Sequence, residues 1–338
     1  MKNVFSALLA ALMLVGILTG CTNQAEMPTV TAAPAGSQAE SAAEEKIRIV
    51  TTIFPEYDWV REILGDKADS AEITMLLDKG VDLHSYQPTA DDLIKISDCD
   101  LFVYVGGESD GWVDDALKNA TNKNRKVINL LDVLGDSVKE EETVEGMQAE
   151  EEDHEDHEEK EYDEHVWLSL KNAEVLVNAI SKSLQELDPG NKDTYAANAD
   201  AYGQKLSALD AEYQKAVSAG TYKTLLFGDR FPFRYLVDDY GLSYYAAFVG
   251  CSAESEASFE TVSFLARKVE EGKLPCVLTI EGKNHKIAET IVQNTAGKNQ
   301  KILTMDSMQS TTSQDVARGT TYLSLMEKNL DVLKQALG

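Results

Sequence analysis

Five residues of this chain combine metal-binding side chains with positions just past strand-like runs. His84 follows a run rich in β-branched residues, and His165 stands where a long acidic run ends. In the second half, Asp229, Glu281 and Asp306 each follow a strand-like run. Two imidazoles with one or two carboxylates suit a first-row divalent metal, because zinc favours nitrogen-rich tetrahedral sites and manganese accepts more oxygen. For each residue alone, the alternative is a surface histidine or a carboxylate that caps the next helix.

Strand-like segments alternate with amphipathic segments, a pattern typical of parallel sheets covered by helices. The strand-like segments are 47–54, 71–77, 100–106 and 125–131 in the first half and 222–228, 243–249, 276–282 and 300–306 in the second. Helical patterns begin at Tyr57, Thr89, Trp112, Phe259, Lys286 and Thr320. Ligand pockets of open α/β sheets form at the carboxyl ends of the strands, so we expect the mouths of two sheets to face one another.

One apolar seam runs through residues 191–218, which are bounded by helix-stopping glycine or proline at both ends. Its members recur at steps of four and three, which predicts a single helix of about 28 residues and roughly 40 Å. They are Tyr195, Ala199, Tyr202, Leu206, Leu209, Tyr213 and Ala216. We therefore predict an α/β fold with two lobes, residues 46–190 and 219–338. Each lobe has a mostly parallel sheet flanked by helices, and the long helix joins them.

The loop 140–164 carries about half of the excess negative charge. It holds 15 acidic residues and one lysine, so −14 of the net charge of −27 lies there, and no basic stripe offsets it, which argues against nucleic acid. His154 and His157 lie among these carboxylates, and we predict that they bind zinc weakly and raise its concentration near the main site. The alternative is a solvated acidic spacer. His165 differs from them, because the apolar residues 166–168 that follow can fix its ring.

The N-terminus has the pattern of an export signal. Lys2 precedes an apolar stretch that suits a signal segment and is marginal for a membrane-spanning helix. The stretch ends in LTGC, which resembles a bacterial lipobox. We predict residues 1–21 as a lipoprotein signal peptide ending at a lipidated Cys21, and residues 22–45, rich in Ala, Ser, Pro and Glu, as a flexible tether. An uncleaved anchor with an incidental cysteine is the alternative.

Three cysteines remain besides Cys21, so at least one thiol is unpaired. Cys251 and Cys276 could form a disulfide in an exported domain, an assignment that spacing alone leaves open. Their separation and context fit no zinc-knuckle pattern.

Three segments resemble the metal-binding solute-binding lipoproteins of ABC transporters, in the zinc/manganese cluster whose two lobes are joined by a rigid helix. The segment GVDLHSYQPTADDL around His84 is similar to that family's H-S-Y-x-P-T element, and DEHVWLSLKNA around His165 to its D-P-H-x-W-L-D-P element. The closing YLSLMEKNLDVL resembles its last helix. The likeness runs from about Lys46 to Leu337, and the first two elements are the specific ones.

The resemblance implies a metal site built from His84 and His165 of the first lobe and Asp306 of the second. The family usually has a third ligand, His or Glu, after the first strand of the second lobe, where this chain reads FGDRF at residues 227–231. Gly228 has no side chain that could bind a metal. The third place is therefore left to Asp229, to Glu281 or to water.

The expected function is high-affinity capture of Zn²⁺ outside the membrane and its delivery to a cognate ABC permease, by a monomeric receptor that is not an enzyme. A manganese receptor of the same type is the first alternative, and a surface adhesin lipoprotein would share the lipid anchor. A metal-dependent hydrolase would activate water at an open coordination position, but the chain has no H-E-x-x-H pattern. The segment GGESDG lacks the lysine of a phosphate loop, so we expect a turn there. The roles of Arg230 and Arg234 are left unexplained.

Overall fold

The computed structural model describes residues 46–118, 120–148, 161–252, 256–282 and 284–338. The predicted signal peptide 1–21 with Cys21, the tether 22–45, and the histidines His154 and His157 lie outside the described residues. Within the described part of the chain, no helix is both long enough and apolar enough to cross a membrane.

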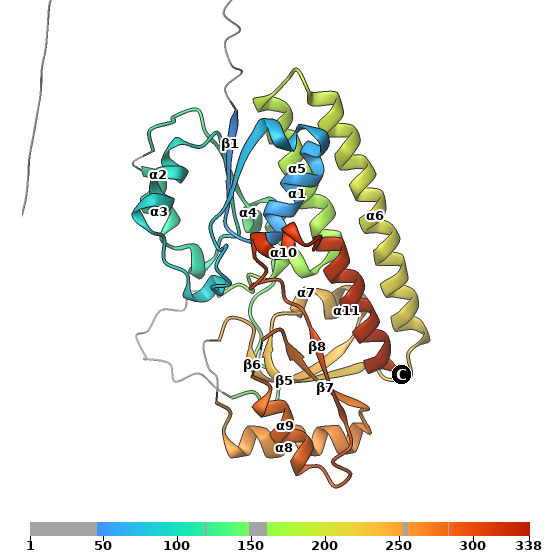
Figure 1. Ribbon diagram of the computed structural model, residues 1–338. Coiled ribbons are helices and arrows are strands. Elements are labelled where there is room, and N and C mark those ends of the chain that lie inside the picture. Colours follow the sequence, from blue (N-terminus) through green and yellow to red (C-terminus); the bar gives the residue numbers. More distant parts are fainter. Residues whose placement is uncertain (1–45, 119, 149–160, 253–255, 283) are drawn as a thin grey trace, which may run out of the picture. The chain divides into compact units, whose positions relative to one another are not determined.

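Two four-stranded sheets, parallel throughout, form the centres of the two lobes (Figure 1). The first sheet has the order β2-β1-β3-β4 and the second β6-β5-β7-β8. The first contains β1 (Ile47–Thr51), β2 (Ala71–Met75), β3 (Leu101–Tyr104) and β4 (Lys126–Asn129). The second contains β5 (Thr224–Phe231), β6 (Ser243–Val249), β7 (Cys276–Ile280) and β8 (Lys301–Met305). Seven strands fall within segments that the sequence predicted, and β5 overlaps its predicted segment at residues 224–228 and continues to Phe231. The predicted fold class is confirmed.

Helices cover both sheets. Those of the first lobe are α1 (Phe54–Leu64), α2 (Ala90–Asp98), α3 (Val113–Lys118), α4 (Leu130–Leu134) and α5 (Leu170–Leu187). After the long helix α6 (Lys192–Ala219) come α7 (Arg234–Tyr240), α8 (Phe259–Gly272), α9 (Lys286–Asn294), α10 (Ser313–Ala317) and α11 (Tyr322–Leu337). The helices α4, α5, α7 and α10 were not predicted. Helix α2 begins where the sequence suggests, because the Thr89 hydroxyl caps it by accepting a hydrogen bond from the Asp92 N–H.

The helix α6 extends along both lobes beside α5 and α11 (Figure 1). It begins and ends one residue later than predicted. The predicted seam is its buried face, except that Val217 rather than Ala216 closes the seam. One hydrophobic cluster runs from the first sheet through α6 to the second, and a smaller cluster lies between the second sheet and the helices α8 and α9. The long helix is therefore part of one continuous core.

The last helix, α11, ties the lobes together a second time. It contacts β5 and β8 of the second lobe and also α1 of the first. At its start, the Tyr322 N–H donates to Asp58 Oδ2 at 2.8 Å, and the Tyr322 hydroxyl donates to the Trp167 carbonyl at 2.6 Å. Residues of the predicted second lobe thus pack on the first.

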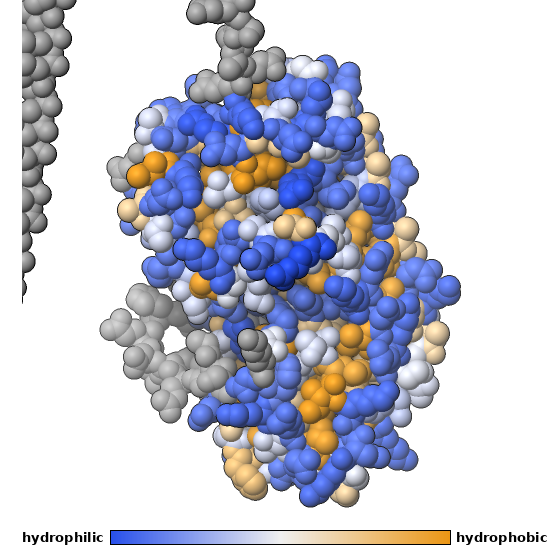
Figure 2. Space-filling view, viewed as in Figure 1, coloured by the Kyte–Doolittle hydropathy of each residue, from blue (hydrophilic) through white to orange (hydrophobic). Residues whose placement is uncertain are grey.

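Hydrophilic side chains cover most of the face seen in Figure 2, with apolar residues in smaller groups between them. This surface agrees with the excess of acidic residues over basic ones in the sequence. Large apolar side chains are mostly inside, and among the described residues the most exposed one is Phe259, at the start of α8.

Candidate metal centre

His84 lies on a single 3₁₀ turn, Leu83–Ser85, in the connection that follows β2. Asp82 caps this turn, because its carboxylate oxygen Oδ1 accepts a hydrogen bond from the His84 N–H at 3.1 Å. Leu83 anchors the turn in the core. The His84 side chain is 8% exposed, so its ring is nearly enclosed while remaining beside the second lobe.

His165 immediately precedes another 3₁₀ turn, Val166–Leu168, whose residues are all fully buried. Trp167 extends into the second lobe, where its indole N–H donates to the Ser307 carbonyl at 2.9 Å. His165 itself is 0% exposed. The apolar residues that follow His165 therefore do hold it in place, as the sequence suggested.

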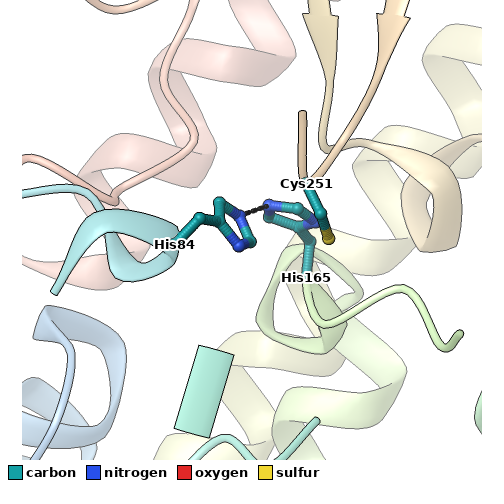
Figure 3. Close-up of side chains that lie close together, drawn as sticks. All are labelled: His84, His165 and Cys251. Atoms are coloured by element: carbon teal, nitrogen blue, oxygen red, sulfur yellow. Dashed lines mark hydrogen bonds between the residues drawn. The ribbon is translucent and has the colours of Figure 1, made fainter. Parts of the chain in front are cut away.

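The two imidazole rings meet edge to edge, with 3.2 Å between the Nε2 atoms (Figure 3). Each ring is held through its other nitrogen: His84 Nδ1 lies 2.8 Å from Ser109 Oγ, and His165 Nδ1 lies 3.0 Å from Asp163 Oδ1. A partner at Nδ1 fixes the tautomer that leaves Nε2 free to bind a metal. Two nitrogens on one tetrahedral zinc, at about 2.0–2.1 Å each, lie roughly 3.3–3.4 Å apart. The observed separation fits a shared zinc ion.

Two buried carboxylates at the end of the acidic loop support these rings. Asp163 and Glu164 are each 2% exposed. Asp163 Oδ1 accepts hydrogen bonds from both the backbone N–H and the ring of His165. Glu164 Oε2 lies 3.4 Å from His84 Nδ1. Burial acts to raise the pKa of Glu164, but hydrogen bonds from His84 and Ser109 outweigh it, so its pKa lies below the usual value.

The GGESDG segment, residues 106–111, forms the expected turn and also shapes the site. Gly107 has φ 82°, and a Cβ there would lie 2.4 Å from Glu164 Oε1, so only glycine allows this approach. Ser109 uses its N–H to donate to Glu164 Oε1 at 2.8 Å and its hydroxyl to contact His84. The turn thus contacts both His84 and Glu164, the residue that precedes His165.

The two ends of the acidic loop pair with each other where the loop leaves and re-enters the domain. Glu140 and Tyr162 form an antiparallel bridge, and the Asp163 N–H donates to the Lys139 carbonyl at 2.9 Å. Further along, the Gln148 N–H donates to the Ala247 carbonyl of β6 at 2.9 Å. Both described ends of the loop are therefore built into the folded domain.

The Sγ atom of Cys251 joins the two histidines: in this group of three, the ligand atoms all lie within 4.8 Å of one another (Figure 3). Cys251 follows β6, past the carboxyl end of a strand of the second lobe. Its thiol and that of Cys276 are free, so the disulfide that the sequence left open is not formed. Burial, and then the charges of Asp163, Glu141 and Glu164, raise the pKa of the Cys251 thiol well above its usual range.

Sequence reasoning missed Cys251 because it considered this residue only as a disulfide partner. The signal was available, since Cys251 occupies the same kind of strand-end position as the predicted ligands.

In the predicted third-ligand segment, residues 227–231, the structure shows the following contacts. A Cβ at Gly228 would lie 2.6 Å from the Ala288 backbone, so this position faces α9. Asp229 Oδ2 accepts the Ile280 N–H at 3.3 Å. Arg230 reaches the site instead: its guanidinium donates to Asp82 Oδ2 at 2.5 Å and to the Ser252 carbonyl at 3.1 Å. It links the loop that carries His84 to the loop that carries Cys251.

Arg234, the other unexplained arginine, pairs with Glu142 of the acidic loop.

Glu281 and Asp306 form a pair at the ends of β7 and β8. The Glu281 carboxylate accepts the Ser307 N–H and hydroxyl, both at 2.7 Å, and Asp306 Oδ1 accepts the Met308 N–H at 2.8 Å. Burial, and then the charge of Glu281, raise the pKa of Asp306 to about 7. The three-residue group at the histidines includes neither of them, nor Asp229. His285, at the start of α9, is also outside that group.

Two parallel α/β lobes joined by one long helix, with a pair of histidines whose Nε2 atoms meet between the lobes, are the features of helix-linked metal-binding solute receptors. A family model described as "Zinc-uptake complex component A periplasmic" (ZnuA) matches residues 49–336. The chain belongs to this family, and the resemblance inferred from the sequence is confirmed.

Relatives share this architecture. The chain is 33% identical to the zinc-binding lipoprotein AdcA of Streptococcus pneumoniae over 99% of its own length, and it spans 61% of the length of that relative. It is 32% identical to the high-affinity zinc uptake system protein ZnuA of Bacillus subtilis, covering 87% of this chain and 88% of that one. The Zn(II)-bound ZnuA-like domain of S. pneumoniae AdcA superposes with a TM-score of 0.67 at 32% identity, covering 87% of this chain and 99% of that domain.

Proposed function

We propose that this protein captures Zn²⁺ outside the membrane and delivers it to a cognate ABC permease for import. The observation that carries the proposal is the 3.2 Å separation of the Nε2 atoms of His84 and His165. If both neutral rings carry their proton on Nδ1, their Nε2 lone pairs face each other at this distance, and a cation between them makes the contact stable. A zinc ion meets that need with its usual bond lengths.

The names of the relatives support the same cargo: one is a zinc-binding lipoprotein and another a high-affinity zinc uptake protein. A nitrogen-rich site also favours zinc over manganese, which prefers carboxylate, carbonyl and water oxygens. Asp306 stays our predicted oxygen donor from the second lobe, with Glu281 and Asp229 as the other two candidates. Affinity is expected to fall as the solution is acidified, because protons compete with zinc for the imidazole nitrogens.

A receptor fits the site better than a hydrolase does. Residues 107–111 spell G-x-S-x-G, and Ser109 touches His84. However, Ser109 Oγ and Glu164 Oε2 both lie against the same ring nitrogen, Nδ1, of His84. A serine–histidine–acid triad needs the serine on one ring nitrogen and the acid on the other.

Attachment to the membrane is proposed through lipid on Cys21 after removal of residues 1–20, with residues 22–45 as the tether. His154 and His157 are proposed to bind zinc weakly and to raise its concentration near the main site. Replacement of Cys21 by serine should shift the protein from the membrane fraction to the medium. Mass spectrometry of the membrane form should find a lipid on this residue, and an unmodified cysteine there would contradict the anchor.

The test of the main proposal is a competition titration with Zn²⁺ and Mn²⁺ in the presence of a chromophoric chelator. We expect tight zinc binding by the wild type, weaker manganese binding, and loss of the tight site in a His84→Ala/His165→Ala double variant. His285→Ala is the matched control and should retain the tight site. Equal zinc affinity of the wild type and the double variant would overturn the proposal.

A further inference from the structure

We propose that Cys251 binds the captured zinc as a thiolate, so that the ion is held by two nitrogens and one sulfur contributed by both lobes. This inference rests on the proposed function, because it names a further ligand of the same site. It assigns a metal-binding role to a residue that the sequence reasoning treated only as a potential disulfide partner.

Distance supports the assignment. The Sγ atom of Cys251 and the ligand nitrogens of His84 and His165 all lie within 4.8 Å of one another. In a tetrahedral site with Zn–N bonds of about 2.0–2.1 Å and a Zn–S bond of about 2.3 Å, nitrogen and sulfur are roughly 3.6 Å apart. The observed separations are within 4.8 Å, so ligation requires a rotation of the Cys251 side chain toward the pair. The two nitrogens are already at their zinc-bound separation.

The loop that presents Cys251 is fixed at three successive residues. A Cβ at Gly250 would lie 3.0 Å from the ring carbon Cε1 of His165, so the loop backbone runs directly against this ring. The Cys251 N–H donates to Glu141 Oε1 at 3.2 Å. The Ser252 carbonyl accepts from Arg230 at 3.1 Å. These contacts hold the loop against the histidine pair, and Figure 3 shows the Cys251 sulfur beside the His165 ring.

Arg230 cannot take the place of Cys251. Arg230 lies beside the site, but a guanidinium has no lone pair to offer a metal, since it stays protonated in proteins. Arg230 instead bridges Asp82 and Ser252, the neighbours of His84 and Cys251. It is a positioning residue that keeps the two ligand-bearing loops together.

Thiolate ligation has a consequence for selectivity. Soft sulfur ligands favour zinc over manganese, whereas a third oxygen ligand would bring the two metals closer in affinity. The S–Zn bond forms as the S–H bond breaks, and the proton passes to the solvent. Replacement of Cys251 by serine should therefore reduce zinc affinity by more than the roughly 10–100-fold that an outer hydrogen-bonding partner contributes, and reduce manganese affinity far less.

The direct test uses the full chain with Cys21 replaced by serine, so that no lipidation-site thiol interferes. Zinc-edge X-ray absorption of this protein should show one sulfur at about 2.3 Å beside nitrogen or oxygen at about 2.0–2.1 Å. Loading with Co²⁺ should give a near-ultraviolet sulfur-to-cobalt charge-transfer band. This band should disappear in Cys251→Ser and persist in Cys276→Ser, the matched control.

The outcomes separate the two proposals. Tight zinc binding that depends on His84 and His165, with no zinc–sulfur distance and no charge-transfer band, would overturn the thiolate assignment and leave the receptor standing. Absence of tight zinc binding in the wild type would overturn the receptor itself. The absorption measurement on protein with an intact Cys251 keeps the inference testable even if Cys251→Ser folds poorly.

Discussion

Replacement of Asp163 is the sharpest test of how the site is built. One carboxylate oxygen of Asp163 accepts both the backbone N–H of His165, at 2.9 Å, and its ring nitrogen Nδ1, at 3.0 Å. Outer partners of metal-binding histidines typically contribute 10–100-fold in affinity. Asp163→Ala removes both hydrogen bonds from a fully buried residue, so we expect the upper end of this range: a loss of zinc affinity of about 100-fold, or 2.7 kcal/mol. Asp163→Asn keeps an oxygen in place but removes the charge, so we expect about tenfold, or 1.4 kcal/mol.

The assay is a zinc titration against a competing chelator, with circular dichroism to confirm that each variant is folded. Glu186→Gln is the control, because Glu186 is an exposed carboxylate on α5 that pairs with Lys126 on the surface. The order of affinities should be wild type and Glu186→Gln, then Asp163→Asn, then Asp163→Ala. If Asp163→Ala binds zinc within threefold of the wild type while His165→Ala does not, the orienting role assigned to Asp163 is wrong.

Three further predictions concern stability and the acidic loop. Burial raises the pKa of Asp58 to about 6, so its ionisation opposes folding: this cost is absent below about pH 4 and complete above about pH 7. Asp58→Asn should therefore increase the free energy of unfolding by up to about 3 kcal/mol at pH 8 and have little effect at pH 4. Urea denaturation at both pH values measures this difference, and equal effects at both would exclude the explanation. Arg230→Ala should lower the free energy of unfolding by about 1–3 kcal/mol. A double-mutant cycle with Asp82→Ala should show coupling between the two residues, and strict additivity would mean that their ion pair is not formed in solution. A deletion confined to residues 149–160, replaced by a short Gly/Ser linker, should keep the tight zinc site within threefold and lose only weakly bound zinc, as counted by equilibrium dialysis; loss of the tight site would refute the auxiliary role of this segment.

The structure explains why the deletion is confined to residues 149–160. The sequence alone suggested that the whole run 140–164 is an accessory loop, because acidic composition is the strongest local signal. The fold instead buries Asp163 and Glu164 beside the histidines and pairs residues near 140 with residues near 162. A larger deletion would remove the support of His165 and would not test the loop. Composition could not reveal this difference, since both kinds of position carry the same acidic side chains.

The strands were predictable because the segments that form the sheets are continuous apolar or β-branched runs separated by turns. The helix α6 was predictable because its buried seam recurs regularly over its whole length. His84 was predicted from its place after a strand, His165 from its place between the acidic run and the apolar residues 166–168, and both from the motifs around them. In each case the informative residues are local in the sequence.

The remaining features depend on contacts between distant segments. β5 has a register shift against β6 between Phe227 and Arg230, and Gly228 before the shift packs on α9. Such an irregularity changes which side chains face the site, and a regular strand pattern does not reveal it. Cys251 reaches the histidines only because Gly250 lets its loop approach the His165 ring. The strand-end position of Cys251 can be read from the sequence, but the register shift and the approach of its loop to His165 cannot.

The connections between the lobes indicate which part of the protein can move when zinc is released. A single hydrophobic cluster runs through both lobes and α6, and α11 adds a second connection through Tyr322. Opening the lobes as rigid bodies would expose part of this cluster to water, with a free-energy cost of about 25 cal/mol for each Å² of apolar surface. Movement of the loop at residues 250–252 requires only the loss of a few polar contacts, such as those to Glu141 and Arg230. Release is therefore expected to begin at this loop, with the histidine pair of the first lobe staying in place.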